Sequence, residues 1–284
     1  MPKILACTDG SQYAPSIYDH TAWAARRLDA AVTVLHMLDP HHEHPPSADS
    51  SGAIGLGAKA QLLDELVEIE AQQARLASQR GNALLEVARE HLSAAGLTDL
   101  RLEQRHGTLP EMIESLEADA DLVILGKRGE KAGFESKHLG QNLERVVRGC
   151  HHPVLLAARE FRPVERFLIA FDGEENAQKA VAFAEASPLL AGLTARLVLA
   201  GTPHAREQSR LDDAAARLRA AGFTVEVKVA PGKPTDVIAA QVTEHNSDLL
   251  LMGAYQHPHW QHLFIGSTTS EIIRRCKTPI LLFR

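Results

Sequence analysis

The sequence predicts two tandem doubly wound α/β domains, each built on a parallel sheet with helices on both faces. Three observations predict this fold class. The chain of 284 residues is long enough for two domains. Three blocks of its sequence occur twice, in the same order. Within each copy, short and continuously apolar runs alternate with amphipathic helical patterns, which is typical of parallel strands buried on both faces.

An internal repeat is the strongest of these observations, because chance similarity rarely preserves the order of three blocks. In the longest block, residues 140–156 (GQNLERVVRGCHHPVLL) match residues 266–282 (GSTTSEIIRRCKTPILL) without a gap, at an offset of 126 residues. The two shorter blocks pair residues 121–126 with 248–253 and residues 3–10 with 166–173.

Apolar runs predict five strands in each copy, and helical patterns fill the intervals between them. An apolar stripe at Ile17, Thr21, Ala24 and Leu28 predicts the first of these helices. In chain order, the predicted strands of the first copy are Lys3–Cys7, Ala31–Met37, Leu100–Arg105, Leu122–Leu125 and Val154–Ala157. Those of the second copy are Phe167–Phe171, Ala195–Leu199, Thr224–Val229, Leu249–Met252 and Ile280–Phe283.

The first copy carries an insertion at about residues 40–95. It is 37 residues longer than the second copy, since the offset between the copies falls from 163 to 126 along the chain. A Pro/Ser/Gly-rich loop opens the insertion, and a long helical pattern with Leu62, Leu66 and Ile69 follows. A polar stretch around Pro163 separates the copies, so we expect the first domain at residues 1–160 and the second at 165–284.

Composition and charge exclude several classes of protein. The formal net charge is −6, which argues against a nucleic-acid-binding protein because such a protein needs a basic surface. No run approaches the ~20 apolar residues of a membrane helix, and the first ten residues lack the layout of a signal peptide. Three cysteines, Cys7, Cys150 and Cys276, leave at least one unpaired, which favours a reducing compartment. We therefore expect a cytoplasmic protein that binds neither nucleic acid nor membrane.

Residues that suit an anionic ligand follow the first and fourth predicted strands of each copy. In a doubly wound sheet, ligands bind beyond the carboxyl ends of the strands, where the winding direction switches. Glycines allow close approach of a phosphate, a helix start attracts negative charge, and an aspartate can accept from a ribose or an adenine. The candidates in the first copy are Asp9, Gly126, Gly129 and Gly140. Those in the second copy are Asp172, Gly253, Gly266, Ser267, Thr268 and Thr269.

These motifs resemble the universal stress protein family, in its tandem two-domain arrangement. The resemblance rests on Asp9-Gly10-Ser11 and on the glycine pair Gly126 and Gly129. It also rests on Gly266-Ser267, which follow residues 253–256 after nine intervening residues (257–265), and on the closing Pro-apolar-apolar strand of each copy. It implies a Rossmann-like, adenine nucleotide alpha hydrolase-like fold with five parallel strands per half. It also implies an internal pseudo-dimer, paired through the last strands around Val154 and Ile280. The implied ligand is ATP or AMP, with or without Mg²⁺.

Neither copy keeps the glycine motif whole. Ten residues, not nine, precede Gly140, and Gln141-Asn142 replaces the Ser/Thr pair; Lys127, Arg128 and Lys131 still supply positive charge there. The second copy has the family spacing before Gly266-Ser267-Thr268, but Gln256 replaces a glycine and Glu174 adds a negative charge. The second copy is therefore the better candidate for adenine nucleotide.

Two other functions stay open. An interaction module would bind no nucleotide and would use its surface, such as residues 40–95, for a protein partner that the sequence does not identify; a homodimer is a further expectation. An ATP-hydrolysing enzyme has no support beyond the fold, since no catalytic residue can be assigned. Loop histidines could bind a metal, but solvated polar loops explain them better, and we expect no metal site; they are His41, His42, His44, His257, His259 and His262. We expect the cysteines to be buried and inert.

Overall fold

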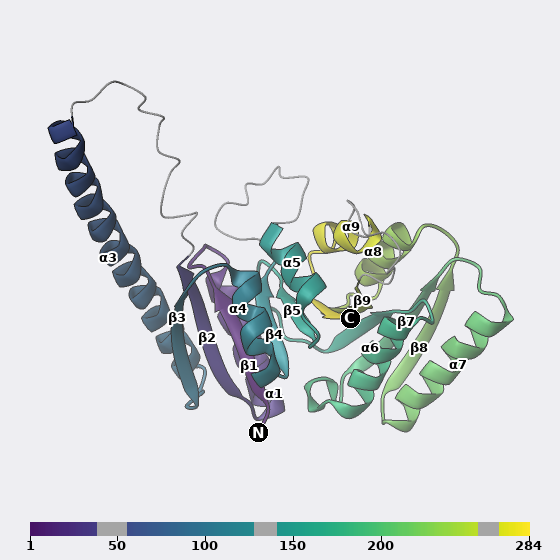
Figure 1. The fold of residues 1–284 in the computed structure, drawn as a ribbon. Coiled ribbons are helices and arrows are strands. Elements are labelled where there is room, and N and C mark those ends of the chain that lie inside the picture. The colour runs from purple at the N-terminus through teal and green to yellow at the C-terminus, as the bar shows by residue number, and fades with distance from the viewer. Residues whose placement is uncertain (39–55, 128–140, 255–266) are drawn as a thin grey trace.

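Two five-stranded parallel sheets join edge to edge into one ten-stranded sheet (Figure 1). The structure is a computed structural model that describes residues 1–38, 56–127, 141–254 and 267–284. The strands of the first half are β1 Lys3–Thr8, β2 Ala31–Leu38, β3 Leu100–His106, β4 Leu122–Gly126 and β5 Val154–Ala157. Those of the second half are β6 Arg166–Ala170, β7 Thr194–Ala200, β8 Thr224–Ala230, β9 Leu249–Gly253 and β10 Ile280–Phe283.

The strand order confirms the predicted fold class. It runs β3-β2-β1-β4-β5-β10-β9-β6-β7-β8, so each half has the same doubly wound order and the second half is reversed relative to the first. All ten predicted strands are present, and eight of them differ from the prediction by one residue at one or both ends, as is usual for strand ends. The continuous apolar runs located these strands because both faces of the sheet are covered.

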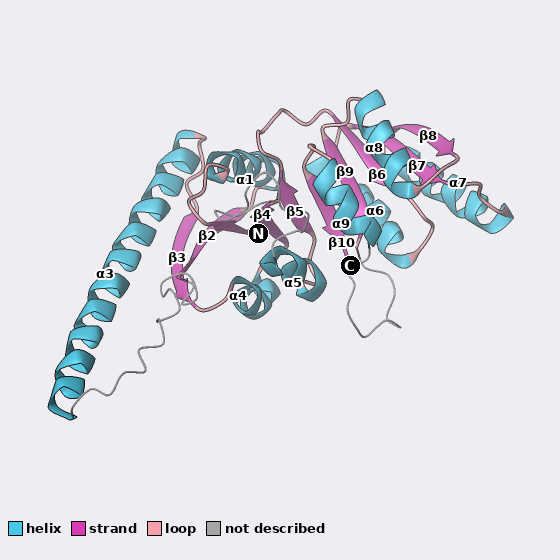
Figure 2. Ribbon diagram, turned by 90° about the horizontal axis from the view of Figure 1, so that it is seen from above, coloured by secondary structure: helices cyan, strands magenta, loops and turns pink. Residues whose placement is uncertain are grey.

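Helices cover both faces of the sheet (Figure 2). Their starts and ends follow local sequence: Pro15, Pro110 and Pro234 lie in first turns, where no backbone N–H is needed, and Asp29 ends the first helix in the left-handed region. The helices of the first half are α1 Ala14–Leu28, α3 Leu56–Ala94, α4 Leu109–Leu116 and α5 Gln141–Gly149, with the 3-10 turn η1 Glu117–Asp119. Those of the second half are α6 Glu175–Ala186, α7 Ala205–Ala220, α8 Pro234–Glu244 and α9 Ser267–Arg275, with η2 Pro188–Leu190.

The hydrophobic core forms two layers, one on each face, and each layer runs through both halves. Alternation along β1 shows how: Ile4 and Ala6 enter the layer beneath α1, α3, α6 and α7, whereas Leu5 and Cys7 enter the layer beneath α4, α5, α8 and α9. The three cysteines are buried and unpaired, as expected.

The halves join through β5 and β10, which pair in the antiparallel sense with Leu155 opposite Leu281. Every residue of both strands is buried. The predicted internal pairing around Val154 and Ile280 is therefore confirmed. Pairing these strands also removes two exposed sheet edges, each of which would otherwise present unpaired backbone groups.

Two basic side chains add contacts across this junction, one from each face. Arg27, at the end of α1, donates from Nε to the carbonyl oxygen of Leu189 at 2.5 Å and also donates to that of Ala191. Lys127, directly after β4, donates from Nζ to the carbonyl oxygens of Cys276 at 2.8 Å and Thr278 at 2.5 Å. Burial lowers the pKa of this ammonium group to about 7.

A buried histidine lies beside the segment that links the halves. His20 in α1 donates from Nδ1 to the carbonyl oxygen of Ser16 at 2.6 Å, and its ring packs edge-on against Phe161. Among the described residues its Nε2 atom has no hydrogen-bond partner. Burial lowers the pKa of His20 to about 4, because a second N–H would be desolvated without an acceptor.

We predict that His20 makes the fold sensitive to acid. The pKa of His20 is about 4 in the folded protein and 6.5 in the unfolded chain, so the unfolded chain takes up a proton first as the pH falls. The contribution of neutral His20 to the stability of the fold is therefore complete above pH 6.5 and is lost as the pH falls towards 4. Between pH 7 and pH 5 the loss from this residue is about 2 kcal/mol. Urea unfolding at the two pH values should show that a His20→Gln variant lacks this part of the pH dependence. An unchanged dependence in the variant would contradict the assignment.

Candidate functional site

The predicted site residues lie at the carboxyl edge of the sheet, in two equivalent places. In the first half β1 lies between β2 and β4, and in the second half β6 lies between β7 and β9. The register pairs Ala6 with Ile124 and Ala170 with Met252. The loops that carry Asp9 and Asp172 therefore leave the sheet next to the ends of β4 and β9, at the switch in winding direction.

Both aspartates shape the loop in which they lie. Asp9 accepts the backbone N–H of Ser11 at 2.9 Å, and Asp172 accepts that of Glu174 at 3.0 Å. The intervening glycines have positive φ, 69° at Gly10 and 77° at Gly173, which side-chain-bearing residues rarely adopt. The repeated Asp-Gly motif thus has a conformational cause in each half. Asp172 is exposed as a residue.

A different side chain covers each of these loops. A Cβ atom added to Gly10 would lie 2.5 Å from Leu84 Cδ1 of α3. A Cβ atom added to Gly173 would lie 3.3 Å from Arg210 Cδ of α7. Arg210 also donates to the carbonyl oxygen of Gly173 at 2.9 Å and lies 3.5 Å from the carboxylate of Glu174. The first loop is therefore covered by an apolar group and the second by a cation that offsets the charge of Glu174.

Gly253, at the end of β9, lies directly against the start of α6. A Cβ atom at this position would be 2.8 Å from Asn176 Cβ and 3.3 Å from the backbone nitrogen of Ala177. The buried side chain of Asn176 donates from Nδ2 to the carbonyl oxygen of Ala254 at 2.8 Å. Close packing of helix on strand thus requires a glycine here, whether or not a ligand also approaches it.

The hydroxyl residues at the start of α9 differ in exposure. Thr268 is exposed, whereas Thr269 is 7% exposed and packs inward. Ser267 is the first residue of the helix. Of the two threonines, only Thr268 can therefore present its hydroxyl to a ligand at this end of the helix.

Several predicted residues fall outside the described part of the chain. These residues are Gly129, Gly140 and Gly266, together with Arg128, Lys131, Gln256 and the six loop histidines. Gly126, in contrast, is described, and it pairs with Ala157 at the end of β4.

The expected role of Lys127 needs correction. Its sequence position in the first glycine loop suggested positive charge for a phosphate. In the structure its ammonium group donates instead to the carbonyl oxygens of Cys276 and Thr278, across the junction. The pairing of β5 with β10 brings that turn within reach, and the sequence of the loop alone carries no sign of it.

Sequence reasoning also missed Leu84, Asn176 and Arg210. Each lies on a helix and reaches the site only because of how that helix packs. Asn176 offered one faint signal, since it is a polar residue three positions after Gly173, at the start of a helix. Nothing in the sequence around Leu84 or Arg210 sets them apart from other helical residues.

Comparison with known proteins identifies the family. The description "Universal stress protein family" applies to a match over residues 1–158 and 198–284. Universal stress protein Slr1230 of Synechocystis sp. is 37% identical over 287 residues, which cover 100% of both chains. The chain belongs to the universal stress protein family. A universal stress protein of Methanocaldococcus jannaschii is 29% identical over 161 residues, 55% of this chain and 82% of that protein.

The fold of this universal stress protein is similar to that of a solved family member. The crystal structure of a universal stress protein from Archaeoglobus fulgidus DSM 4304 has a TM-score of 0.74 at 18% identity, and the similarity covers 99% of this chain and 98% of that one. The second family match begins at Val198 in β7, so the loop with Asp172 lies outside it. Within the ranges that the structure describes, no helix is both long and apolar enough to cross a membrane.

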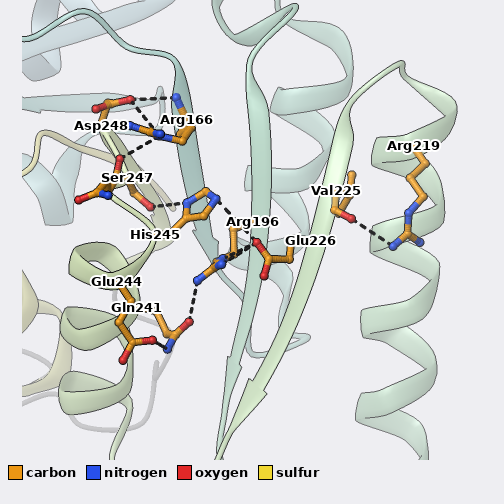
Figure 3. A network of polar contacts seen from close by, with 11 residues as sticks. Arg166, Arg196, Arg219, Val225, Glu226, Gln241, Glu244, His245, Ser247 and Asp248 are labelled. Atoms are coloured by element: carbon orange, nitrogen blue, oxygen red, sulfur yellow. Dashed lines mark hydrogen bonds and ion pairs between the residues drawn. The ribbon is translucent and has the colours of Figure 1, made fainter.

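A polar network lies at the amino-terminal ends of the strands in the second half, opposite the carboxyl ends that carry the candidate site (Figure 3). Asp248, just before β9, accepts the backbone N–H of Arg166 at 3.0 Å, and Arg196 in β7 donates to Glu226 and to Gln241. Asp121 accepts the N–H of Lys3 in the equivalent place of the first half. This edge holds the amino ends of the strands, so the network stabilises the fold and lies away from the candidate site.

The cysteines of this universal stress protein are poor nucleophiles. Burial raises the pKa of Cys150 to about 12 and also raises the pKa values of Cys7 and Cys276. The reactive thiolate is therefore scarce at neutral pH. A pocket between α4 and α5 includes Cys150 and Arg145 in its lining but none of the predicted site residues.

We predict that Gly253→Ala destabilises the protein in the absence of any ligand. The added methyl group overlaps Asn176 Cβ and approaches the backbone of α6, which should cost about 1–3 kcal/mol. Gly149→Ala is the matched control, since among the described residues no atom outside its own helix lies within 4 Å of the added carbon. Denaturant unfolding of the two variants measures the difference. Equal stabilities would show that the contact of α6 with β9 tolerates a side chain.

Proposed function

We propose that this universal stress protein holds one adenine nucleotide, ATP or AMP, in its second half. The supporting observation is the start of α9, where Gly266-Ser267-Thr268 leads into the helix with Thr268 exposed. This helix start follows β9, which pairs with β6. The loop after β6 carries Asp172. We further propose domains at residues 1–160 and 165–284, a cytoplasmic location and a regulatory role in stress response.

The charges around the second site support an anionic ligand. The N-terminal turn of α9 offers backbone N–H groups, which favour a phosphate. The negative charge of Glu174 would repel a phosphate. The guanidinium group of Arg210 lies 3.5 Å from the carboxylate of Glu174 and offsets this charge. Asp172 is suited to the opposite end of the nucleotide, because its exposed carboxylate can accept from ribose hydroxyls or from the adenine amino group.

The first site is less suited to a nucleotide. Leu84 covers Gly10, and Lys127 donates to carbonyl groups of the second half. Gln141 and Asn142 stand where the second copy has Ser267 and Thr268, so no hydroxyl follows the helix start. One nucleotide per chain is therefore the proposed stoichiometry, and we propose holding of the nucleotide rather than its turnover.

A second candidate function is an interaction module without nucleotide. The contact of Leu84 with Gly10 favours it, because an apolar side chain fills the place next to the first Asp-Gly loop. In this alternative both glycine sites serve only the fold, and α3 and the rest of the surface carry the function.

We predict that calorimetric titration with ATP and Mg²⁺ gives one site per chain. Gly266→Val should abolish binding, because the side chain blocks close approach of a phosphate to the backbone. Gly140→Val should leave the heat unchanged. Two sites would contradict the assignment to one half, and the absence of heat and of a thermal shift at saturating ATP would favour the interaction module.

A paired substitution tests the orientation of α9. Thr268→Val removes an exposed hydroxyl from the helix start and should weaken binding about tenfold, the value of one hydrogen bond to a charged group. Thr269→Val is the matched control: this residue is buried, so its replacement should leave the dissociation constant unchanged. The same titration measures both variants. A larger loss at Thr269 than at Thr268 would contradict the proposed site.

A further inference from the structure

An arginine bridges α8 and α9 in the second half. Arg275 is the last residue of α9, and its Nη1 atom donates to Asp236 Oδ1 of α8 at 2.6 Å. The same Nη1 atom donates to Glu271 Oε1 of α9 at 3.1 Å. One guanidinium group thus lies between the two helices and contacts an acidic residue on each of them.

The first half lacks this arginine. Both α4 and α8 begin two residues after a glycine of positive φ, so Glu111 and Asp236 are the third residues of equivalent helices. α5 and α9 match without a gap at an offset of 126 residues, so Gly149 stands where the second half has Arg275. Glu111 therefore keeps the position of its acidic equivalent, but no arginine lies at the facing position of α5.

A pocket of about 270 Å³ lies between α4 and α5, where this side chain is missing (Figure 2). Gly149 is part of its lining, and a Cβ atom added there would meet no described atom outside its own helix within 4 Å. Ile113 and Val146, both buried, contribute apolar surface to the pocket. Sites for drug-sized ligands occupy ~300–1,000 Å³, so this smaller pocket suits a molecule of the size of an amino acid.

The two walls of the pocket carry opposite charges. Glu111 and Glu114 line it from α4, and Arg145 and Arg148 line it from α5. The two residues of each wall are three positions apart and therefore lie on the same side of their helix. Within the described part of the chain, Glu111, Glu114 and Arg145 make no hydrogen bond and no ion pair. The pocket thus offers acceptors on one wall and donors on the other.

These charges indicate the chemistry of a ligand. Arg145 stands where the second half has Glu271, so the charge on this wall is reversed relative to the second half. A cation alone would be repelled by Arg145, and an anion alone would be repelled by Glu111 and Glu114. A molecule with a cation at one end and an anion at the other meets an opposite charge on both walls. A guanidinium group is the cation found at the equivalent place in the second half, and its planar donors match carboxylates.

We propose that the pocket between α4 and α5 binds a small zwitterion that carries a guanidinium group and a carboxylate, as free L-arginine does. The guanidinium group donates to Glu111 and Glu114, and the carboxylate accepts from Arg145 and Arg148. All four residues are exposed, so solvent weakens these contacts and we expect a dissociation constant of roughly 1 mM. The site shares no residue with the proposed nucleotide site and does not depend on nucleotide.

The test is a titration of the full, isotopically labelled chain with L-arginine, followed by NMR. Saturable shifts of backbone amide signals are expected in α4 and at the end of α5. Agmatine lacks the carboxylate, and L-citrulline has a neutral group in place of the guanidinium. Each should bind at least about tenfold more weakly than L-arginine, because each loses hydrogen bonds between charged groups.

A side chain that fills the pocket provides a second test. Gly149→Arg places an arginine where the second half has Arg275 and should abolish the saturable shifts. Gly149 has no positive φ, so its backbone accepts a side chain. Ala216→Arg is the matched control: it adds the same group at an exposed position of α7, in the other half, and should leave binding unchanged.

The acidic wall is tested by removing its charges. Glu111→Gln with Glu114→Gln should weaken binding of L-arginine about tenfold, the value of one hydrogen bond to a charged group. Glu68→Gln with Glu70→Gln is the matched control, because it removes two negative charges from exposed positions of α3, which packs on the other face of the sheet. This control should keep the affinity.

Several outcomes would overturn the proposal. One is the absence of saturable shifts at millimolar L-arginine, which would show that the two walls neutralise each other without a ligand. Others are agmatine binding as tightly as L-arginine, and binding that persists in Gly149→Arg. Because every substituted residue is exposed, thermal unfolding should show that the variants remain folded and thereby separate lost binding from lost structure.

Discussion

The pairing of β5 with β10 is the interaction on which the rest of this structure depends. Each of these strands is short, and all of its residues are buried. Neither could stand as an exposed edge, since its backbone groups would lack partners and its leucines would face water. Antiparallel pairing resolves both problems at once. It also merges the cores of the two halves, so that each apolar layer continues across the junction.

This junction makes two similar sequences behave differently. The turn between α9 and β10 comes to lie against the end of β4, and Lys127 donates to two of its carbonyl oxygens. In the second copy the residue that follows Gly253 is Ala254, whose carbonyl oxygen instead accepts from Asn176. A charged anchor in one half thus corresponds to a small buried residue in the other. Tandem duplication allows such a difference, because each half can change without the other, whereas identical subunits of a homodimer must change together.

The fold could be predicted from the sequence because its signals are local. Runs such as Leu249–Met252 are apolar throughout, and only a strand covered on both faces requires this. The Asp-Gly turns are local as well, since Asp172 and Gly173 determine the loop through one hydrogen bond and one positive φ. The environment of the site is different. Leu84 and Arg210 reach their glycines across a helix packing contact, and no short stretch of sequence encodes the position of one helix over another.

The two helices that cover the Asp-Gly loops show how the halves diverged. α3 and α7 follow the second strand of their half and both reach over the loop of the first strand. In α7 the covering residue is Arg210, a cation that compensates Glu174 and favours a negatively charged ligand. In α3 it is Leu84, which has no charge to offer such a ligand but adds apolar contact for this helix. The side chain that covers the first Asp-Gly loop therefore also helps to hold α3 in place. A single change in what covers a loop can thus alter both the charge beside that loop and the packing of the helix that covers it.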